Sequence, residues 1–290
     1  MSTQERSMPF IKNLASSDRK IRTQALTSLH TFLSAKHISA SLSTLDILKL
    51  WKGLFFALWM CDRAVPQQNL CNELASLIDV LPRNAVVPWL RGFWATMSRE
   101  WTGIDVLRME KFLLLVRRVV GAAFKWMKKS AEGKKGKKSK QQAGESLWDM
   151  QRVDDIVELL GEWPFSLEDE ARIEKGTEKE ELVPQNIPVG LRLHVLDIWV
   201  DEAEKVGMLD EADLEGGKIV QRIIDQVDAL EQATTRPAVR IRSKESLEDE
   251  RLPGNKKATE EGEGEGDEKM GDADGDDDKG DSGSWDGFDE

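Results

Sequence analysis

The 290-residue sequence contains no tyrosine, three histidines and only two cysteines. Two cysteines cannot supply a disulfide framework, and the spacing of Cys61 and Cys71 matches no metal or redox motif. His30, His37 and His194 never fall four residues apart, so the sequence offers no zinc motif. His194 lies in an apolar segment and is interpreted as a core or boundary residue.

Motifs that build active sites are missing as well. No phosphate-binding loop, dinucleotide-binding fingerprint or nucleophile elbow occurs in a segment that is expected to fold. Glu100, Asp105 and Glu110 could supply a carboxylate pair, but no histidine or second polar cluster lies near them in sequence. We therefore expect no enzyme activity, no cofactor and no small-molecule substrate.

Long hydrophobic runs are also lacking. The most apolar stretch, Gly53 to Cys61, is uncharged for nine residues, whereas a membrane-spanning helix needs about 20. The first ten residues show neither the apolar core nor the cleavage site of a secretory signal. We expect neither a membrane span nor secretion.

The sequence is rich in tryptophan and in helical periodicity. Residues 45–62 carry two adjacent apolar stripes, one through Leu50 and Leu54 and the other through Trp51 and Phe55. A helix that is apolar almost all round is normally buried by neighbours on several sides. Most of the ten tryptophans are expected in the core, with Trp285 as the exception.

Helices account for most of the predicted structure, and no segment alternates long enough for a strand. The expected helices span residues 9–15, 18–36, 43–62, 66–81, 84–101, 105–127, 145–163, 188–206 and 210–234. They favour an all-α fold, a HEAT-like or ARM-like array of antiparallel helix pairs, with a compact irregular bundle as the alternative. Pro237 is taken as a stop signal, and Gly103 is expected to allow a tight turn.

Charge and composition divide the chain into four parts. We predict an N-terminal helical half at 1–128, a Lys-rich disordered linker at 129–145, a second helical half packing on the first at 146–234, and a disordered acidic tail at 235–290. Residues 1–140 carry a net charge of +14, and residues 260–290 carry −13. The tail is interpreted as a segment that engages basic protein or competes for the lysine linker.

Two groups of basic residues are candidates for function. The first lies on one face of the 105–127 helix and comprises Arg108, Lys111, Arg118 and Lys125. It is either a solvated face or a surface for phosphates. The second lies in the linker and comprises Lys134, Lys135, Lys137, Lys138 and Lys140. It is a candidate nuclear-import signal or polyanion-binding arm, or simply a solvated linker.

Two blocks of sequence resemble the signature blocks of the ribosomal RNA-processing protein 1 family, which is nucleolar. They are LKLWKGLFFALWMCD at 48–62 and FWATMSREWTGIDVLRMEKF at 93–112. The segments 10–22 and 190–197 are also similar to that family. The structural residues of the two blocks are Trp51, Gly53, Trp59, Trp94, Trp101 and Gly103.

The resemblance implies an all-helical, non-enzymatic assembly factor of the nucleus and nucleolus. Its partner would be a pre-ribosomal particle, with assembly factors and precursor rRNA of the large subunit, and it would act as a scaffold in rRNA processing and ribosome biogenesis. Candidate contacts are Arg99, Arg108, Lys111, Arg118 and Lys125; for those in the second block, a structural ion pair or cap is the other interpretation. The alternative function is a HEAT-like protein–protein adaptor with no RNA role.

Overall fold

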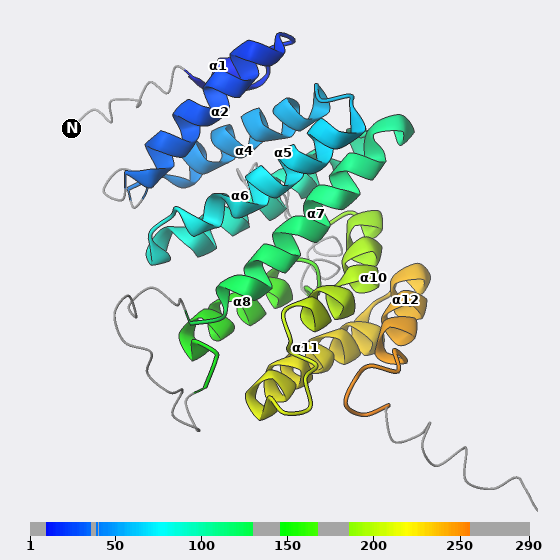
Figure 1. Cartoon of the computed structure of the whole chain (residues 1–290). Helices are drawn as coiled ribbons and strands as arrows, with labels where there is room; N and C mark the ends of the chain where they lie inside the picture. The colour runs from blue at the N-terminus through cyan, green and yellow to red at the C-terminus, as the bar shows by residue number, and fades with distance from the viewer. Residues whose placement is uncertain (1–9, 36–38, 40, 130–145, 168–185, 256–290) are drawn as a thin grey trace, which may run out of the picture.

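The computed structural model describes residues 10–35, 39, 41–129, 146–167 and 186–255, and its regular structure there is helical (Figure 1). The first half contains α1 (Phe10–Leu14), α2 (Arg19–Ser34), α4 (Thr44–Trp59), α5 (Ala64–Ser76), η1 (Leu77–Asp79), α6 (Arg83–Glu100), η2 (Trp101–Gly103) and α7 (Val106–Trp126). The second contains α8 (Met150–Glu162), α10 (Val189–Lys205), α11 (Leu214–Ala233) and α12 (Pro237–Leu247). Within these ranges the β pairing is one isolated bridge between Lys128 and Trp148. The all-α prediction is confirmed.

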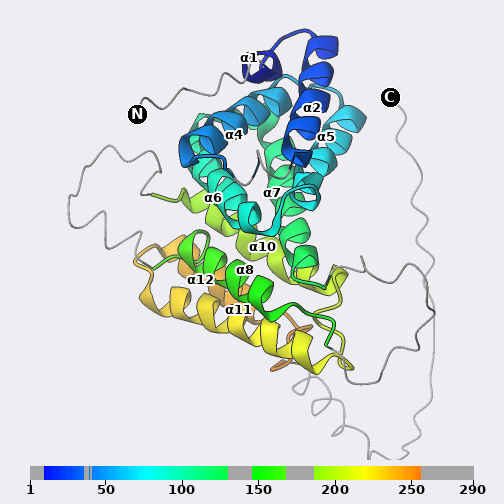
Figure 2. The same ribbon diagram turned by 90° about the vertical axis from the view of Figure 1, so that its left-hand side faces the viewer.

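The helices form an array because alternate helices of the chain pack on one another. Helix α4 packs on α6, while α5 packs on α7, α7 on α10, and α10 on α12. Figure 2 shows α8, α11 and α12 at the end of the array opposite to α1 and α2. One continuous core runs from Leu14 near the start to Leu252 near the end of the described chain. This arrangement agrees with the predicted array of helix pairs rather than an irregular bundle.

Helix α4 is the buried inner helix that the apolar stripes predict. Its start is a capping box, because Ser43 Oγ accepts from Asp46 N and the Asp46 carboxylate accepts from Ser43 N. Trp51 packs against Trp89 and Phe93 of α6, with ring centroids 4.9 and 5.0 Å away. Its indole Nε1 donates to the carbonyl oxygen of Trp89 at 2.9 Å, so this buried N–H is satisfied.

Two helix starts differ from prediction. The helix predicted from residue 84 begins one residue earlier, because α6 starts at Arg83 with Pro82 in the cap position. Helix α8 begins at Met150, five residues after the expected start, since Asp149 caps it and donates its backbone N–H to the carbonyl of Met127. That strand-like pairing beside the end of α7 keeps the preceding residues extended.

The end of the described chain corrects the predicted domain boundary. Pro237 does not stop a helix; it occupies the first turn of α12, where its missing N–H is not needed. Val239 and Leu252 are buried, and Trp199 Nε1 of α10 donates to Ser246 Oγ at 2.7 Å. Residues 235–255 are therefore folded, and the prediction that they belong to a disordered tail is wrong. The prediction for 256–290 lies outside the described residues.

An ion-pair network holds this added segment in place. Arg251 donates to the carboxylates of Glu204 at 2.7 Å, Asp201 at 2.9 Å and Asp249 at 2.7 Å. Arg117 of α7 donates to the same Asp201 at 2.9 Å. The side-chain hydrogen bond from Arg251 is the main effect that lowers the pKa of Asp249. The network ties the chain after α12 to α10 and α7.

Close approach of α6 to α4 depends on Gly92. A Cβ added there would overlap Ile47 Cγ2 and lie 3.3 Å from Trp51 Cδ1. Ile47 is β-branched and buried, so it has little freedom to move away.

We predict that Gly92→Ala lowers the free energy of unfolding by about 1–3 kcal/mol, because the inserted methyl overpacks the α4–α6 contact. Gly217→Ala in α11 is the control, since a Cβ there would meet nothing within 4 Å. It should be neutral or stabilise by up to about 1 kcal/mol through helix propensity. Urea unfolding of both variants tests this; equal stabilities would contradict it.

Candidate interaction surface

The carboxyl end of α4 is held by two basic side chains from different helices. Arg22 of α2 donates to the carbonyls of Ser16 and Ser17, and its Nη2 reaches Met60 O at 3.1 Å. Lys111 Nζ of α7 donates to Trp59 O and Cys61 O, both at 2.8 Å. Carbonyls in the last turn of a helix lack intrahelical partners and carry partial negative charge, so cations bind there favourably.

This geometry overturns the prediction that Lys111 is a surface contact. The residue is 4% exposed, and its three N–H donors face the end of α4 rather than solvent. Burial lowers the pKa of Lys111, while the Asp62 carboxylate, 3.6 Å away, acts in the opposite direction. The helical wheel placed Lys111 beside Arg108 and Arg118, but it could not show that α4 ends against it.

We predict that Lys111→Met destabilises the chain by about 1–3 kcal/mol, the cost of leaving a buried carbonyl without its donor. Lys52→Met on the exposed side of α4 is the matched control, because Lys52 only approaches Glu100 at 3.6 Å. That change should stay within about 0.5 kcal/mol. Thermal unfolding of the two variants side by side checks the difference; equal losses would contradict the capping role.

Beside this capped end lies an exposed set of apolar side chains, which we call the apolar edge: Met60, Val65, Val106 and Leu107. Val106 is 87% exposed and Leu107 is 92% exposed. Their neighbour Arg108 pairs with Asp105 and lies over the Trp59 ring, 5.0 Å from its centroid. That contact places the first turn of α7 against the end of α4, where the α4–α5 turn also lies (Figure 1).

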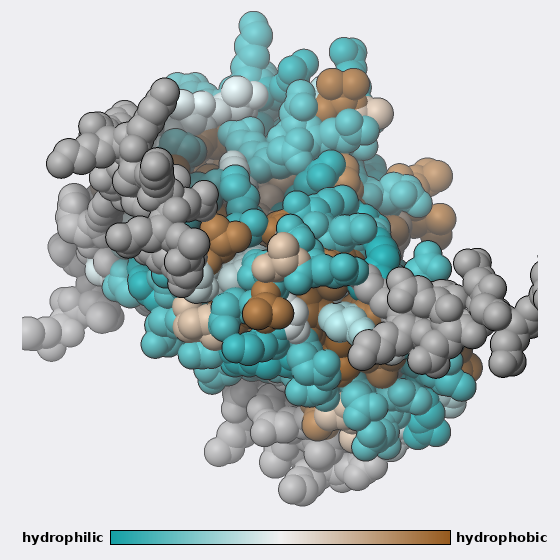
Figure 3. Space-filling model, turned by 60° about the horizontal axis from the view of Figure 1, so that its bottom comes forward, coloured by the Kyte–Doolittle hydropathy of each residue, from teal (hydrophilic) through white to brown (hydrophobic). Residues whose placement is uncertain are grey.

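Leu107 is exposed although the apolar residues of an amphipathic helix normally face the core. The first turn of α7 extends past the helices that cover the rest of it. A different face, in Figure 3, is mainly hydrophilic, with separate hydrophobic patches. Exposed aliphatic residues that lie next to one another are candidates for an interaction surface.

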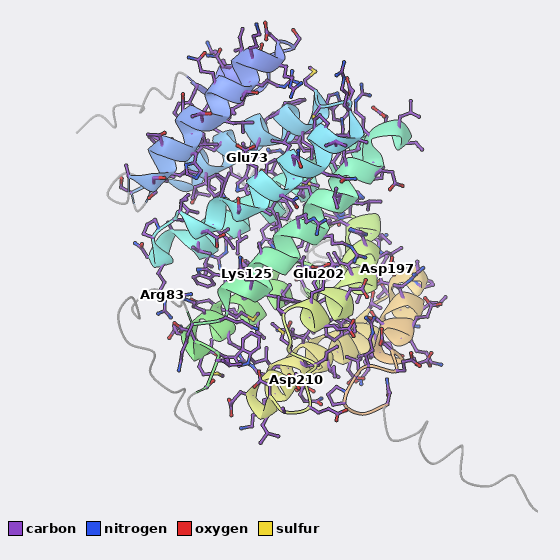
Figure 4. The ribbon with its side chains drawn as sticks, in the orientation of Figure 1. Glu73, Arg83, Lys125, Asp197, Glu202 and Asp210 are labelled. Atoms are coloured by element: carbon purple, nitrogen blue, oxygen red, sulfur yellow. The ribbon has the colours of Figure 1, made fainter. Side chains whose placement is uncertain are left out.

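The other predicted contacts do not form a continuous stripe. Arg99 is exposed and donates to Glu100 at 2.9 Å. Arg118 is half-buried, and its Nε has no hydrogen-bond partner among the described residues. Lys125 is exposed in the last turn of α7, toward α8 in Figure 4, about 25 Å along the helix from Arg108. Four residues remain candidate contacts, each at a separate place on the surface: Arg99, Arg108, Arg118 and Lys125.

The signature residues are structural in different ways. Trp94 and Trp101 are buried, whereas Trp59 is half-buried beneath Arg108. A Cβ on Gly53 would come 2.9 Å from Leu14 Cδ1. The absence of a side chain at this position therefore lets α1 pack closely on α4. Gly103 does not have a positive φ, and a Cβ there would meet nothing within 4 Å. Gly103 does lie in the turn between α6 and α7, but this turn does not depend on the conformational freedom of glycine.

The candidate import residues Lys134, Lys135, Lys137, Lys138 and Lys140 lie outside the described residues. Their role stays a prediction.

No catalytic arrangement is assembled in the part of the chain that the structure describes. Across those ranges no three His, Cys, Asp or Glu side chains gather closely enough to hold a metal ion. His194 Nε2 lies 2.8 Å from Leu113 O, between α10 and α7, and burial lowers its pKa. Glu100 and Asp105 are engaged with arginines. None of the described helices combines the length and apolarity that a membrane crossing requires.

The two cysteines differ sharply in environment. Cys71 is buried, and its thiol donates to Lys111 O at 3.5 Å. Burial raises the pKa of Cys71 to about 12. Cys61 is half-buried at the end of α4. Since the thiolate is the reactive form, only Cys61 is placed to react.

We predict that a disulfide reagent at pH 8 modifies one thiol quickly in the native chain and the second only after unfolding. Cys61→Ser should remove the fast phase, and a fast phase that survives this change would contradict the assignment. Because the folded-state pKa of Cys71 lies above its usual value of about 8.5, the stability linked to this proton is complete below that pH. It declines as the pH rises toward 12.

These features define a class of protein: an all-α array of packed helix pairs. The chain belongs to the Nop52 family of nucleolar proteins, whose profile matches residues 5–285. The resemblance seen in the two signature blocks is thereby confirmed.

Curated relatives agree with this assignment. The chain is 31% identical over 202 residues to ribosomal RNA processing protein 1 homolog B of Homo sapiens and 30% identical over 211 residues to that of Mus musculus. It is 28% identical over 200 residues to homolog A of Homo sapiens. These regions cover 68%, 71% and 68% of this chain but only 22%, 25% and 36% of the relatives. The chain thus spans about a quarter to a third of their length.

Proposed function

We propose that the chain is a non-enzymatic scaffold of the nucleolus that takes part in rRNA processing within large-subunit precursor particles. The family description names nucleolar proteins, and the relatives are named for ribosomal RNA processing. The helical array offers extended faces and, in its described part, no assembled metal or catalytic cluster.

The observation that carries the proposal is the apolar edge. Val106 and Leu107 contribute nothing to the core of the chain, and they directly precede Arg108, which lies over Trp59 of the other signature block. Covering each of these side chains on binding would contribute about 1.5–3 kcal/mol. Aromatic and arginine side chains are also enriched at interaction hot spots. A protein component of the precursor particle would bind here.

Contacts to precursor rRNA would be secondary in this arrangement. Arg99, Arg108, Arg118 and Lys125 are separated along the array, and the first two already pair with carboxylates. An adaptor with no RNA role is the alternative function, because the apolar edge would serve it equally well. The two functions differ in one outcome: loss of the apolar edge should change the level of precursor rRNA only if the chain takes part in rRNA processing.

We predict that Val106→Ser with Leu107→Ser weakens co-purification with precursor particles by at least about tenfold, because the apolar contact area is lost. In cells depleted of the protein, this double variant should fail to clear an accumulated rRNA precursor, whereas the unchanged chain should restore processing. Normal precursor levels after depletion would favour the adaptor.

Leu214→Ser is the matched control. Leu214 is also an exposed leucine in a first helical turn, that of α11, and is 78% exposed at a distant part of the array. It should restore processing fully. Both variants should unfold within about 0.5 kcal/mol of the unchanged chain, as surface changes do, so that a loss of association reflects the edge and not the fold.

A further inference from the structure

A groove of about 470 Å³ lies between α2 and α5, above the end of α4. Its floor is apolar and includes Leu26, Ala57 and Leu70. Packing explains the opening: α2 packs mainly on α1, whereas α5 packs mainly on α7. The volume lies within the range of about 300–1,000 Å³ that is typical of small-molecule pockets.

Positive charge surrounds this floor. Arg19 of α2 and Arg63 before α5 line the groove, and within the described ranges neither guanidinium makes an ion pair. Arg22, the third arginine, is occupied with the carbonyls at the end of α4. Two acids line the same groove, Asp62 and Glu73 of α5 (Figure 4). Asp62 is balanced by Lys111, which lies 3.6 Å away, so the three arginines outnumber the remaining acid, Glu73. The groove therefore suits an acidic ligand with an apolar anchor.

One segment of the chain has this chemistry and lies outside the described residues. Residues 281–290 read DSGSWDGFDE, with four acids, no basic residue, and the aromatics Trp285 and Phe288 three positions apart. These are the only aromatic residues after Trp199. The lysine linker at 129–145 could attract the same acids, but its only apolar residues are Ala131 and Ala143, which are too small for the two rings to pack on.

Tethering makes this segment a better occupant than a free acidic peptide. About 25 residues connect the last described position, Asn255, to Asp281. Such a chain has a root-mean-square span of about 25–30 Å when flexible and can extend to about 80–90 Å. The α12 end and the α2 end lie at opposite ends of the array (Figure 1), so the proposed docking requires an extended tether. A flexible tether supplies up to about millimolar effective concentration, so even a weak peptide contact is populated.

We propose that residues 281–290 dock in the groove between α2 and α5. Trp285 and Phe288 pack on Leu26, Ala57 and Leu70, and the flanking carboxylates face Arg19 and Arg63. Met60 lines the groove and also belongs to the apolar edge. The docked segment therefore lies against one end of the proposed partner surface.

Cys61 provides the test because it lines the same groove. Ser284→Cys, next to Trp285, is introduced into the full chain, and formation of a disulfide with Cys61 is followed under mild oxidant. Met270→Cys in the same tail is the control for random encounters. We expect Ser284→Cys to cross-link about tenfold faster or more, since burial of one aromatic side chain is worth at least that factor. Cys61→Ser should abolish the product, because Cys71 is buried.

Two further variants separate docking from simple charge attraction. Trp285→Ala with Phe288→Ala should reduce the rate to that of the Met270→Cys control, and Arg19→Glu with Arg63→Glu should do the same. Equal rates for Ser284→Cys and Met270→Cys, or a rate unaffected by loss of the two aromatics, would overturn the proposal. Cross-linked dimers in place of monomers would assign the groove to the tail of a second copy and overturn docking within one chain. The rate of this disulfide cross-link does not depend on partner binding at the apolar edge. Failure of the docking proposal can therefore be distinguished from failure of the proposed function.

Discussion

The hydrogen bonds from Arg22 and Lys111 to the end of α4 join three helices at one point. Helix α4 is apolar on nearly all sides, so it must be covered by neighbours, yet its final carbonyls need polar partners. Those partners are Arg22 of α2, which precedes α4 in the chain, and Lys111 of α7, which follows it. Arg108, one turn before Lys111, then covers Trp59. The groove and the apolar edge both border this capped end because the surrounding helices diverge there.

The arrangement separates the basic residues of the N-terminal half into structural and available ones. Lys111 and Arg22 stabilise the fold, and Arg108 divides its interactions between Asp105 and Trp59. Lys125, Arg19 and Arg63 make no ion pair within the described ranges. The function proposed above places partner contacts at the ends of the helices, where apolar and cationic side chains are exposed, rather than along one long basic face.

Much of the fold was predictable from local patterns. The capping box at Ser43, the stripes around Trp51 and the cap at Asp18 each act through neighbours in sequence, and the helices that they define lie close to the predicted ranges 18–36 and 43–62. Helix α12 was missed because its apolar residues are few and its cohesion comes from Trp199 and from the ion pairs of Arg251, which belong to distant segments. The role of Pro237 could not be predicted from sequence, because proline is common both just after the end of a helix and in its first turn.

The candidate site was less predictable, because exposure depends on which helix ends where. Lys111 and Leu107 lie within four residues on α7, yet the charged one is buried and the apolar one exposed. The sequence alone determined the all-α class, the inner helix and the family, since these follow from periodicity and from short, specific strings. Only the tertiary structure decided that α4 ends against Lys111. It also decided that the first turn of α7 extends past the neighbouring helices that cover the rest of α7. Those contacts join residues about 50 positions apart in the chain, and no local pattern encodes them.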